Sequence, residues 1–141
     1  MNAVRAVSVV QWLGIVAFVA VWAMDVPGYR SVWDNSYLRT AIAGECALRA
    51  AMLAFALYTT LTMMRRQRLF PVLFAAELIL VGALPIATFL WNCIATGVGG
   101  LALLTMPGVL LWTALGVFAA ALWTLTVRRS PALAGAFVTP G

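Results

Sequence analysis

Four long stretches almost free of charge constrain this sequence more than any other feature. They cover about residues 6–24, 41–64, 70–91 and 107–127. Roughly 20 mainly apolar residues in a helix cross the hydrocarbon core of a bilayer, which is about 30 Å thick. Backbone groups in lipid must bond within the chain, and a helix satisfies its own. The sequence therefore predicts an all-α integral membrane protein, a four-helix bundle formed by one domain over residues 1–141.

The composition points to lipid as the solvent. Of the 141 residues, 65% are hydrophobic and only 9% are charged, whereas a soluble domain has about 25% charged residues. The first stretch resembles a signal peptide, with a short basic region before it and "AVWA" before Met24. Its apolar core exceeds the roughly 7 to 15 residues of a signal peptide, so we expect a retained span.

The arginines predict the orientation, because short basic loops stay in the cytoplasm. Only Arg30 and Arg39 fall on the outer side, in a loop over 25–40 that also holds Asp25 and Asp34. The opposite side carries Arg5, Arg65, Arg66, Arg68, Arg128 and Arg129. We therefore expect both termini in the cytoplasm, and the lysine-free, Ala- and Arg-rich composition favours a bacterial inner membrane.

The net charge of +5 does not indicate a nucleic-acid-binding protein. Such a surface needs basic side chains gathered on a folded, water-facing patch. Here Arg65, Arg66 and Arg68 form a short cytoplasmic turn between two spans. Membrane topology and anionic lipid headgroups explain this basic turn better.

The outer loop is the longest exposed connection that the sequence predicts. Pro27 and Gly28 indicate a turn. Oxygens of Asp34, Asn35 and Ser36 are suited to capping the helix of the second span. We expect this loop to be the main surface for a partner outside the cytoplasm.

Two charges in the second span are spaced to pair. Glu45 and Arg49 lie four residues apart with the acid first, so they share a helix face. The pair either locks the span into the bundle or belongs to an ion path, a substrate path or a partner contact. Small residues at four-residue spacing let another backbone approach and predict an interior helix. These residues are Ala43, Ala47 and Ala51, together with Ala50 and Ala54.

Glu77 is the only charge in the third span and completes a candidate intramembrane charge network with Glu45 and Arg49. It lies about 10 Å from the cytoplasmic boundary by helical rise, so direct pairing with Arg49 is strained. A buried carboxyl group without a cation usually takes up a proton. Three roles stay open: an interhelical bond or partner contact, proton or cation coupling, and placement toward a cavity. The nearer candidate partners are Arg65, Arg66, Arg68, Thr60 and Thr62.

Catalytic and cofactor chemistry finds little support in the sequence. Histidine is absent, which removes bis-histidine haem, most zinc and copper sites and the commonest general base. No nucleophile elbow or phosphate loop is present, so we expect no enzyme, cofactor or metal. Cys46 and Cys93 lie near outer span ends, as apolar filler or as a disulfide. They do not form the C-x-x-C motif of a thiol oxidase.

The segment between the last two spans contains Gly97, Gly99 and Gly100 as helix breakers. Residues 101–106 either extend the fourth helix, with Pro107 as a kink, or lie in the interface. Pro71 follows the basic turn and suits the first turn of the third span, where no hydrogen bond is lost.

Two short stretches carry a resemblance to a known family. These are "MMRRQRLFPVLF", which joins the second and third spans, and "VRRSPALAGAFVTP" after the fourth. They resemble the domain-of-unknown-function 2569 family of small four-span bacterial inner-membrane proteins. In the first stretch Met63, Met64, Arg65, Arg66, Arg68 and Pro71 match. In the second, Arg128, Arg129, Ser130, Ala136, Phe137 and Val138 match loosely. The resemblance implies the fold and the membrane, but no activity.

The sequence favours a non-enzymatic membrane protein that binds another membrane protein as an accessory, assembly or regulatory subunit. Small size, sparse chemistry and Ala-rich faces suited to lateral packing motivate this expectation. Immunity against a membrane-targeting toxin is a second hypothesis. A third is a small proton-coupled or oligomeric transporter that uses Glu77. The expected partners are the lipid bilayer and a membrane protein or a second copy of the chain.

Overall fold

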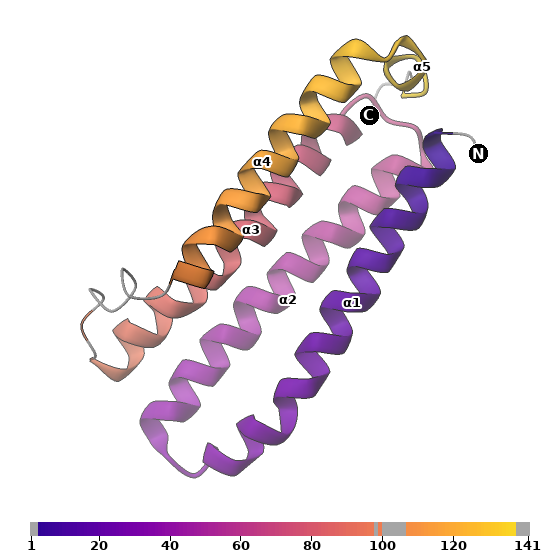
Figure 1. Cartoon of the computed structure of the whole chain (residues 1–141). Helices are drawn as coiled ribbons and strands as arrows, with labels where there is room; N and C mark the ends of the chain where they lie inside the picture. The colour runs from indigo at the N-terminus through magenta and orange to yellow at the C-terminus, as the bar shows by residue number, and fades with distance from the viewer. Residues whose placement is uncertain (1–2, 98, 100–106, 138–141) are drawn as a thin grey trace.

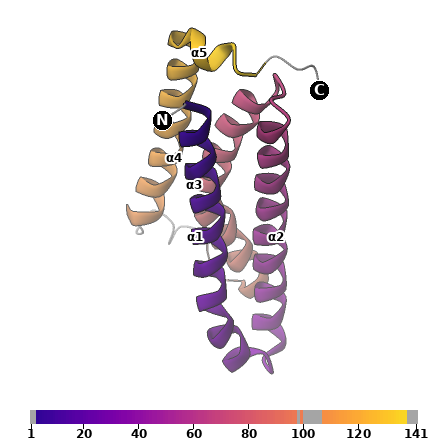
Figure 2. The ribbon, with the colours of Figure 1, turned by 90° about the vertical axis from the view of Figure 1, so that its right-hand side faces the viewer.

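The computed structural model describes residues 3–97, 99 and 107–137, which are almost entirely helical and contain no extended strand. The helices are α1 (Ala3–Val32), α2 (Ser36–Met64), α3 (Phe70–Thr96), α4 (Pro107–Arg129) and α5 (Pro131–Ala134). The four long helices lie roughly alongside one another, and the side view agrees (Figures 1 and 2). All four have the length and hydropathy of membrane spans. The predicted all-α four-helix bundle is therefore confirmed, and the chain is a multi-pass membrane protein.

The first connection is much shorter than the loop expected over 25–40. Helix α1 continues to Val32 and α2 begins at Ser36, so the expectation of a long loop was wrong. Pro27 and Gly28 lie inside α1 rather than in a turn. Side chains of this last part of α1 bond to α2, as described below, and these bonds favour continued helix over the local Pro-Gly turn signal.

Of the three residues that the sequence offers as caps for α2, namely Asp34, Asn35 and Ser36, the structure uses Asn35. Its side-chain oxygen accepts hydrogen bonds from the backbone N–H groups of Tyr37 and Leu38, at 3.1 and 3.4 Å. These groups have no partner within the helix, so the cap satisfies them. At the other end, α3 begins at Phe70 with Pro71 in its first turn, also as predicted.

Helices α3 and α4 approach closely at a pair of glycines. A Cβ atom added to Gly116 would lie 2.7 Å from the Cα atom of Gly82, and one added to Gly82 would lie 2.9 Å from the Cα atom of Gly116. Contacts this short leave no space for a side chain. Beside them, the Thr113 hydroxyl donates to the Gly82 carbonyl at 2.7 Å. The glycines thus let the two backbones meet.

A tryptophan fixes α3 against α2 at the end opposite α5. The indole Nε1 of Trp91 donates to the Ala41 carbonyl at 3.0 Å. Its ring occupies the space left by Gly44, where an added Cβ atom would lie 2.0 Å from the ring. Gly44 therefore faces α3.

An aromatic cluster closes the other end of the bundle, where α5 and the start of α1 lie (Figure 1). Phe70 is fully buried and packs on Phe74, Trp123 and Phe137, with ring centroids 5.5, 6.0 and 4.7 Å away. The Trp123 indole also donates to the Pro71 carbonyl at 2.9 Å. The chain after α4 is thereby anchored back onto α3.

The small residues of α2 face outward, contrary to expectation. Helix α2 does lie between α1 and α3, but it turns Met52, Ala56, Thr59 and Thr60 inward. Most of these inward side chains are larger than alanine and fill the space between the helices. The exposed residues are Ala43, Ala47, Ala50, Ala51 and Ala54.

Part of the segment before α4 is helical. Helix α3 extends to Thr96 and ends at Gly97, whose φ of 72° is left-handed and suits a residue without a Cβ atom. The alternatives for residues 101–106 lie outside the described residues. Pro107 is the first residue of α4.

Candidate functional site

The Glu77 carboxyl group lies at the meeting point of three helices. It is buried on α3, and its partner is Gln11 on α1, which is also buried. The Gln11 Nε2 atom lies 2.9 Å from each of the two carboxyl oxygens. One amide group thus contacts both oxygens and joins α1 to α3.

Helix α2 supplies two further oxygens to the same amide group. Nε2 of Gln11 lies 3.2 Å from Oγ1 of Thr60 and 3.3 Å from the Ala56 carbonyl oxygen. The Thr60 hydroxyl itself donates to that carbonyl at 2.8 Å. The amide nitrogen therefore has four oxygen neighbours from α2 and α3, and we name these four atoms with Gln11 the inner polar cluster.

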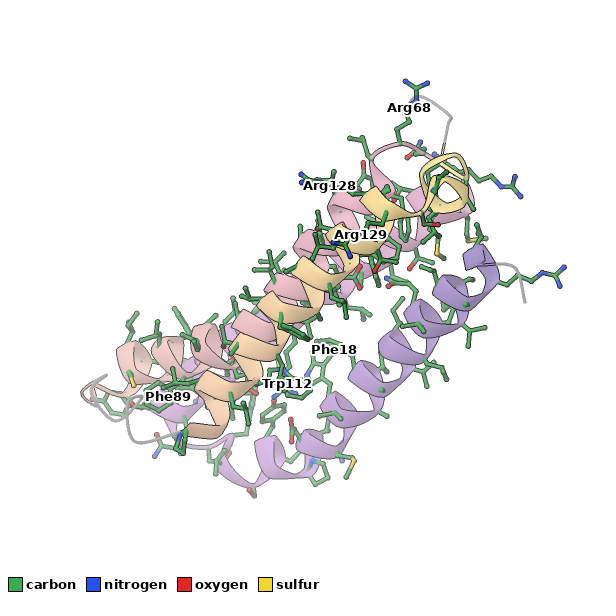
Figure 3. All side chains as sticks on the ribbon, turned by 45° about the horizontal axis from the view of Figure 1, so that its top comes forward. Phe18, Arg68, Phe89, Trp112, Arg128 and Arg129 are labelled. Carbon is green, nitrogen blue, oxygen red and sulfur yellow. The ribbon has the colours of Figure 1, made fainter. Side chains whose placement is uncertain are left out.

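A groove of about 170 Å³ adjoins the inner polar cluster between α1, α2 and α3. Apart from Gln11 and Glu77, the residues that line it are apolar. They are Val10, Gly14, Ile15, Phe18, Met52, Leu53, Ala56, Phe74, Leu78 and Val81. Figure 3 shows Phe18 projecting from α1 toward the side where α4 and Trp112 lie. A single carboxyl group in an apolar groove offers both charge recognition and space for a small hydrophobic group.

The Glu45 and Arg49 side chains form the contact that their spacing predicts. Arg49 donates to Glu45 Oε1 at 2.5 Å and to Asp25 Oδ2, on α1, at 2.6 Å. The Tyr29 hydroxyl donates to the same Glu45 oxygen at 2.8 Å. These four residues, which we name the outer charge cluster, fasten the last turns of α1 to α2 and satisfy charges that are costly in lipid.

Glu77 does not join Glu45 and Arg49, so the expectation of one network over all three residues was wrong. Gln11 belongs to one cluster and Asp25 to the other, and their separation of fourteen positions along α1 corresponds to about 21 Å of helix. The two clusters hold α1 at different depths. Arginine side chains do not reach across such a distance, which is why two separate groups form.

Gln11, the main partner of Glu77, was not predicted from the sequence. Thr60 was among the candidates and contacts Gln11, whereas the Thr62 hydroxyl donates to the Thr59 carbonyl at 2.7 Å. The signal that could have identified Gln11 is its amide group, since an amide within an apolar stretch needs a polar partner in lipid. Asp25, the second partner of Arg49, and Tyr29, a partner of Glu45, were also not predicted, because the sequence placed them in or near a loop.

The basic turn lies at the same end as α5. Arg65, Arg66 and Arg68 are exposed there, and Figure 3 shows Arg68 at the end of the bundle that also carries Arg128 and Arg129. Arg66 has a φ of 53°, in the left-handed region, within the tight connection between α2 and α3. The arginines that the sequence groups on one side thus gather at one end of the molecule.

Cys46 and Cys93 are not joined, so a disulfide between them is not part of this structure. Gly44 faces α3, and Cys46 follows two residues later, about 200° around the helix. Cys46 instead lines a shallow pocket with Val26 and Tyr29 of α1.

The outer charge cluster thus holds one end of α1 against α2, and a single buried carboxyl group lies in a groove near the other end of α1. Among the described residues, no cluster of three or more His, Cys, Asp or Glu side chains is placed to hold a metal ion. Comparison with protein-family models, curated proteins and solved structures finds no match.

Proposed function

We propose that this chain is a non-enzymatic accessory, assembly or regulatory subunit that binds another protein within a bacterial inner membrane. The observation that carries the proposal is the exposed small-residue face of α2. Ala43, Ala47 and Ala51 recur at every helical turn on this face and are exposed. In lipid, such faces favour association because small side chains let a second helix approach closely.

The inner polar cluster and the outer charge cluster also support a partner contact through the exposed face of α2. They bond α1 to α2 and α3 from within the chain, so Glu45, Arg49 and Glu77 do not need a partner to satisfy them. The outward face of α2 is then apolar and smooth, and it is suited to packing against a partner helix rather than to exchanging charges with it.

Capture of the tagged full-length chain in a mild detergent tests the proposal. We expect a membrane protein in a stoichiometric amount, and we expect Ala47→Phe to reduce its recovery by about tenfold, since a bulky ring at a close helix contact costs roughly 1–3 kcal/mol. Leu111→Phe is the matched control, because Leu111 is exposed on α4, away from this face.

Two results would contradict the proposal. One is repeated recovery of the tagged chain alone. The other is recovery of a partner whose amount is the same for the wild type and Ala47→Phe. Co-expression of two differently tagged copies distinguishes a second copy of the chain from a different protein.

A further inference from the structure

The Gln11 amide nitrogen occupies a position with more acceptors than it has hydrogens. Four oxygens lie 2.9 to 3.3 Å from Nε2: both oxygens of Glu77, Oγ1 of Thr60 and the Ala56 carbonyl. A side-chain amide carries two donor hydrogens. It cannot donate to all four oxygens at once, so a group with more hydrogens or a positive charge would satisfy this position better.

A protonated amine has both properties. An ammonium group carries up to three donor hydrogens and a full charge, and its hydrogen bonds to a carboxylate are stronger than those of a neutral amide. The four oxygens come from three residues on two helices, so they surround the position from several directions.

The groove beside the inner polar cluster sets the size and character of the rest of such a ligand. Its volume is about 170 Å³, and an apolar protein cavity of about 150 Å³ is large enough for benzene. Its remaining lining is apolar and includes two aromatic rings, Phe18 and Phe74. A single ring or a short branched alkyl group fits these walls, and aromatic faces also attract organic cations.

We propose that this groove binds a small hydrophobic amine in its protonated form. The ammonium group takes the place of the Gln11 amide against Glu77 and Thr60, and the apolar group lies in the groove among Phe18, Leu53 and Phe74. This binding site is distinct from the exposed face of α2 and does not depend on the proposed partner.

An inorganic divalent cation suits the site less well. Calcium takes six to eight oxygen ligands at about 2.3 to 2.6 Å, and beyond the four oxygens and the Gln11 amide the described lining has only apolar side chains. The same lining is favourable for the hydrocarbon part of an organic cation, because burying apolar area contributes roughly 25 cal/mol per Å².

Binding of phenethylammonium to the full-length chain in an uncharged detergent tests the inference, with equilibrium dialysis as the measurement. Glu77→Gln is expected to weaken binding by at least about tenfold, because removing one partner of a buried charged hydrogen bond costs more than this factor. Asp34→Asn is the matched control, since it removes an exposed carboxylate in the connection between α1 and α2. We expect this variant to bind phenethylammonium with the affinity of the wild type.

Neutral ethylbenzene tests the role of charge with nearly the same shape. We expect it to bind at least about tenfold more weakly than phenethylammonium, since it forms no hydrogen bond with the carboxylate. Gln11→Ala removes the internal competitor and is expected to tighten phenethylammonium binding by about threefold or more, because the binding-competent state no longer requires the amide to move.

Gly14→Leu keeps the test decisive if Glu77→Gln does not fold, as judged by far-ultraviolet circular dichroism. Gly14 lines the groove and an added Cβ atom meets nothing within 4 Å, so leucine fills the groove while Gln11 and Glu77 remain. It is expected to weaken phenethylammonium binding. Equal affinity of a folded Glu77→Gln and the wild type, equally tight binding of ethylbenzene, or unchanged affinity in Gly14→Leu would each overturn the inference.

Discussion

Glu77 is compatible with an apolar helix because one amide group on another helix bonds both of its oxygens. Gln11 contacts the carboxyl group at 2.9 Å twice, and both side chains are buried. A polar group in a bilayer has no water to replace a lost partner, so the two residues depend on each other. Their coupling is therefore a property that substitutions at the residue scale can measure.

Gln11→Leu is expected to lower the free energy of unfolding by about 1–3 kcal/mol, because it leaves the Glu77 carboxyl group without its main donor. Adding Glu77→Leu should restore more than half of the loss, since neither polar group is then buried. Unfolding in dodecyl sulfate, followed by circular dichroism, measures both changes. Val10→Leu, at an exposed neighbour on α1, is the control, and strictly additive losses would contradict the coupling.

At the scale of the helices, two kinds of contact hold the bundle together. Helices α3 and α4 meet backbone to backbone at Gly82 and Gly116, which is a packing contact. Helix α1 is fastened to α2 by the outer charge cluster and to α3 by Gln11, which are polar contacts. We expect the glycine contact to be sensitive to the size of a substituted side chain, and the polar contacts to be sensitive to the loss of a charge or a hydrogen-bond donor.

Gly116→Ala is expected to destabilise the protein by about 1–3 kcal/mol, since its Cβ atom would lie 2.7 Å from the backbone of α3 and force the helices apart. Gly108→Ala is the matched control on the same helix, where an added Cβ atom meets nothing within 4 Å. Thermal unfolding in detergent compares the two variants. Equal midpoints would show that α3 and α4 do not cross at these glycines.

Arg49→Met should release α1 from α2 at the outer end, because it keeps an apolar stem but removes the donor shared by Asp25 and Glu45. The expected loss is about 1–3 kcal/mol, below that of a fully buried pair because Asp25 is partly exposed. Arg39→Met, at an exposed arginine of the same helix, serves as the control. Faster proteolysis of α1 in Arg49→Met alone would support this fastening, and equal rates would argue against it.

For the whole molecule, the ends of the helices carry different charges. The start of α1, the turn between α2 and α3, and α5 all lie at one end (Figure 1), together with Arg68, Arg128 and Arg129 (Figure 3). Short basic segments are retained in the cytoplasm. We therefore propose that this end faces the cytoplasm and that the connection through Asp34 faces the opposite side.

Labelling with a membrane-impermeant maleimide on spheroplasts checks this orientation, in a chain whose Cys46 and Cys93 are replaced by alanine. We expect Asp34→Cys to react in intact spheroplasts and Ala132→Cys to react only after lysis, because both positions are exposed at opposite ends. The reverse pattern would place the basic end outside and contradict the proposed topology.

The sequence by itself determined what depends on local composition and on the solvent. Four apolar stretches predicted four helices, and the spacing of Glu45 and Arg49 predicted their contact. The run Asp34, Asn35 and Ser36 predicted a helix cap, which Asn35 forms. Each depends on residues close together in the chain, where helical geometry specifies the distance. The resemblance to a family of four-span proteins stays a prediction.

Only the tertiary structure decided which faces of the helices meet. The contact between Gln11 and Glu77 joins residues 66 positions apart, and the crossing of Gly82 and Gly116 joins α3 to α4. Neither contact follows from helical periodicity, since in lipid an apolar side chain is about equally stable against acyl chains and against another helix. The bilayer selects helices, whereas close packing and the pairing of buried polar groups select how the helices are arranged.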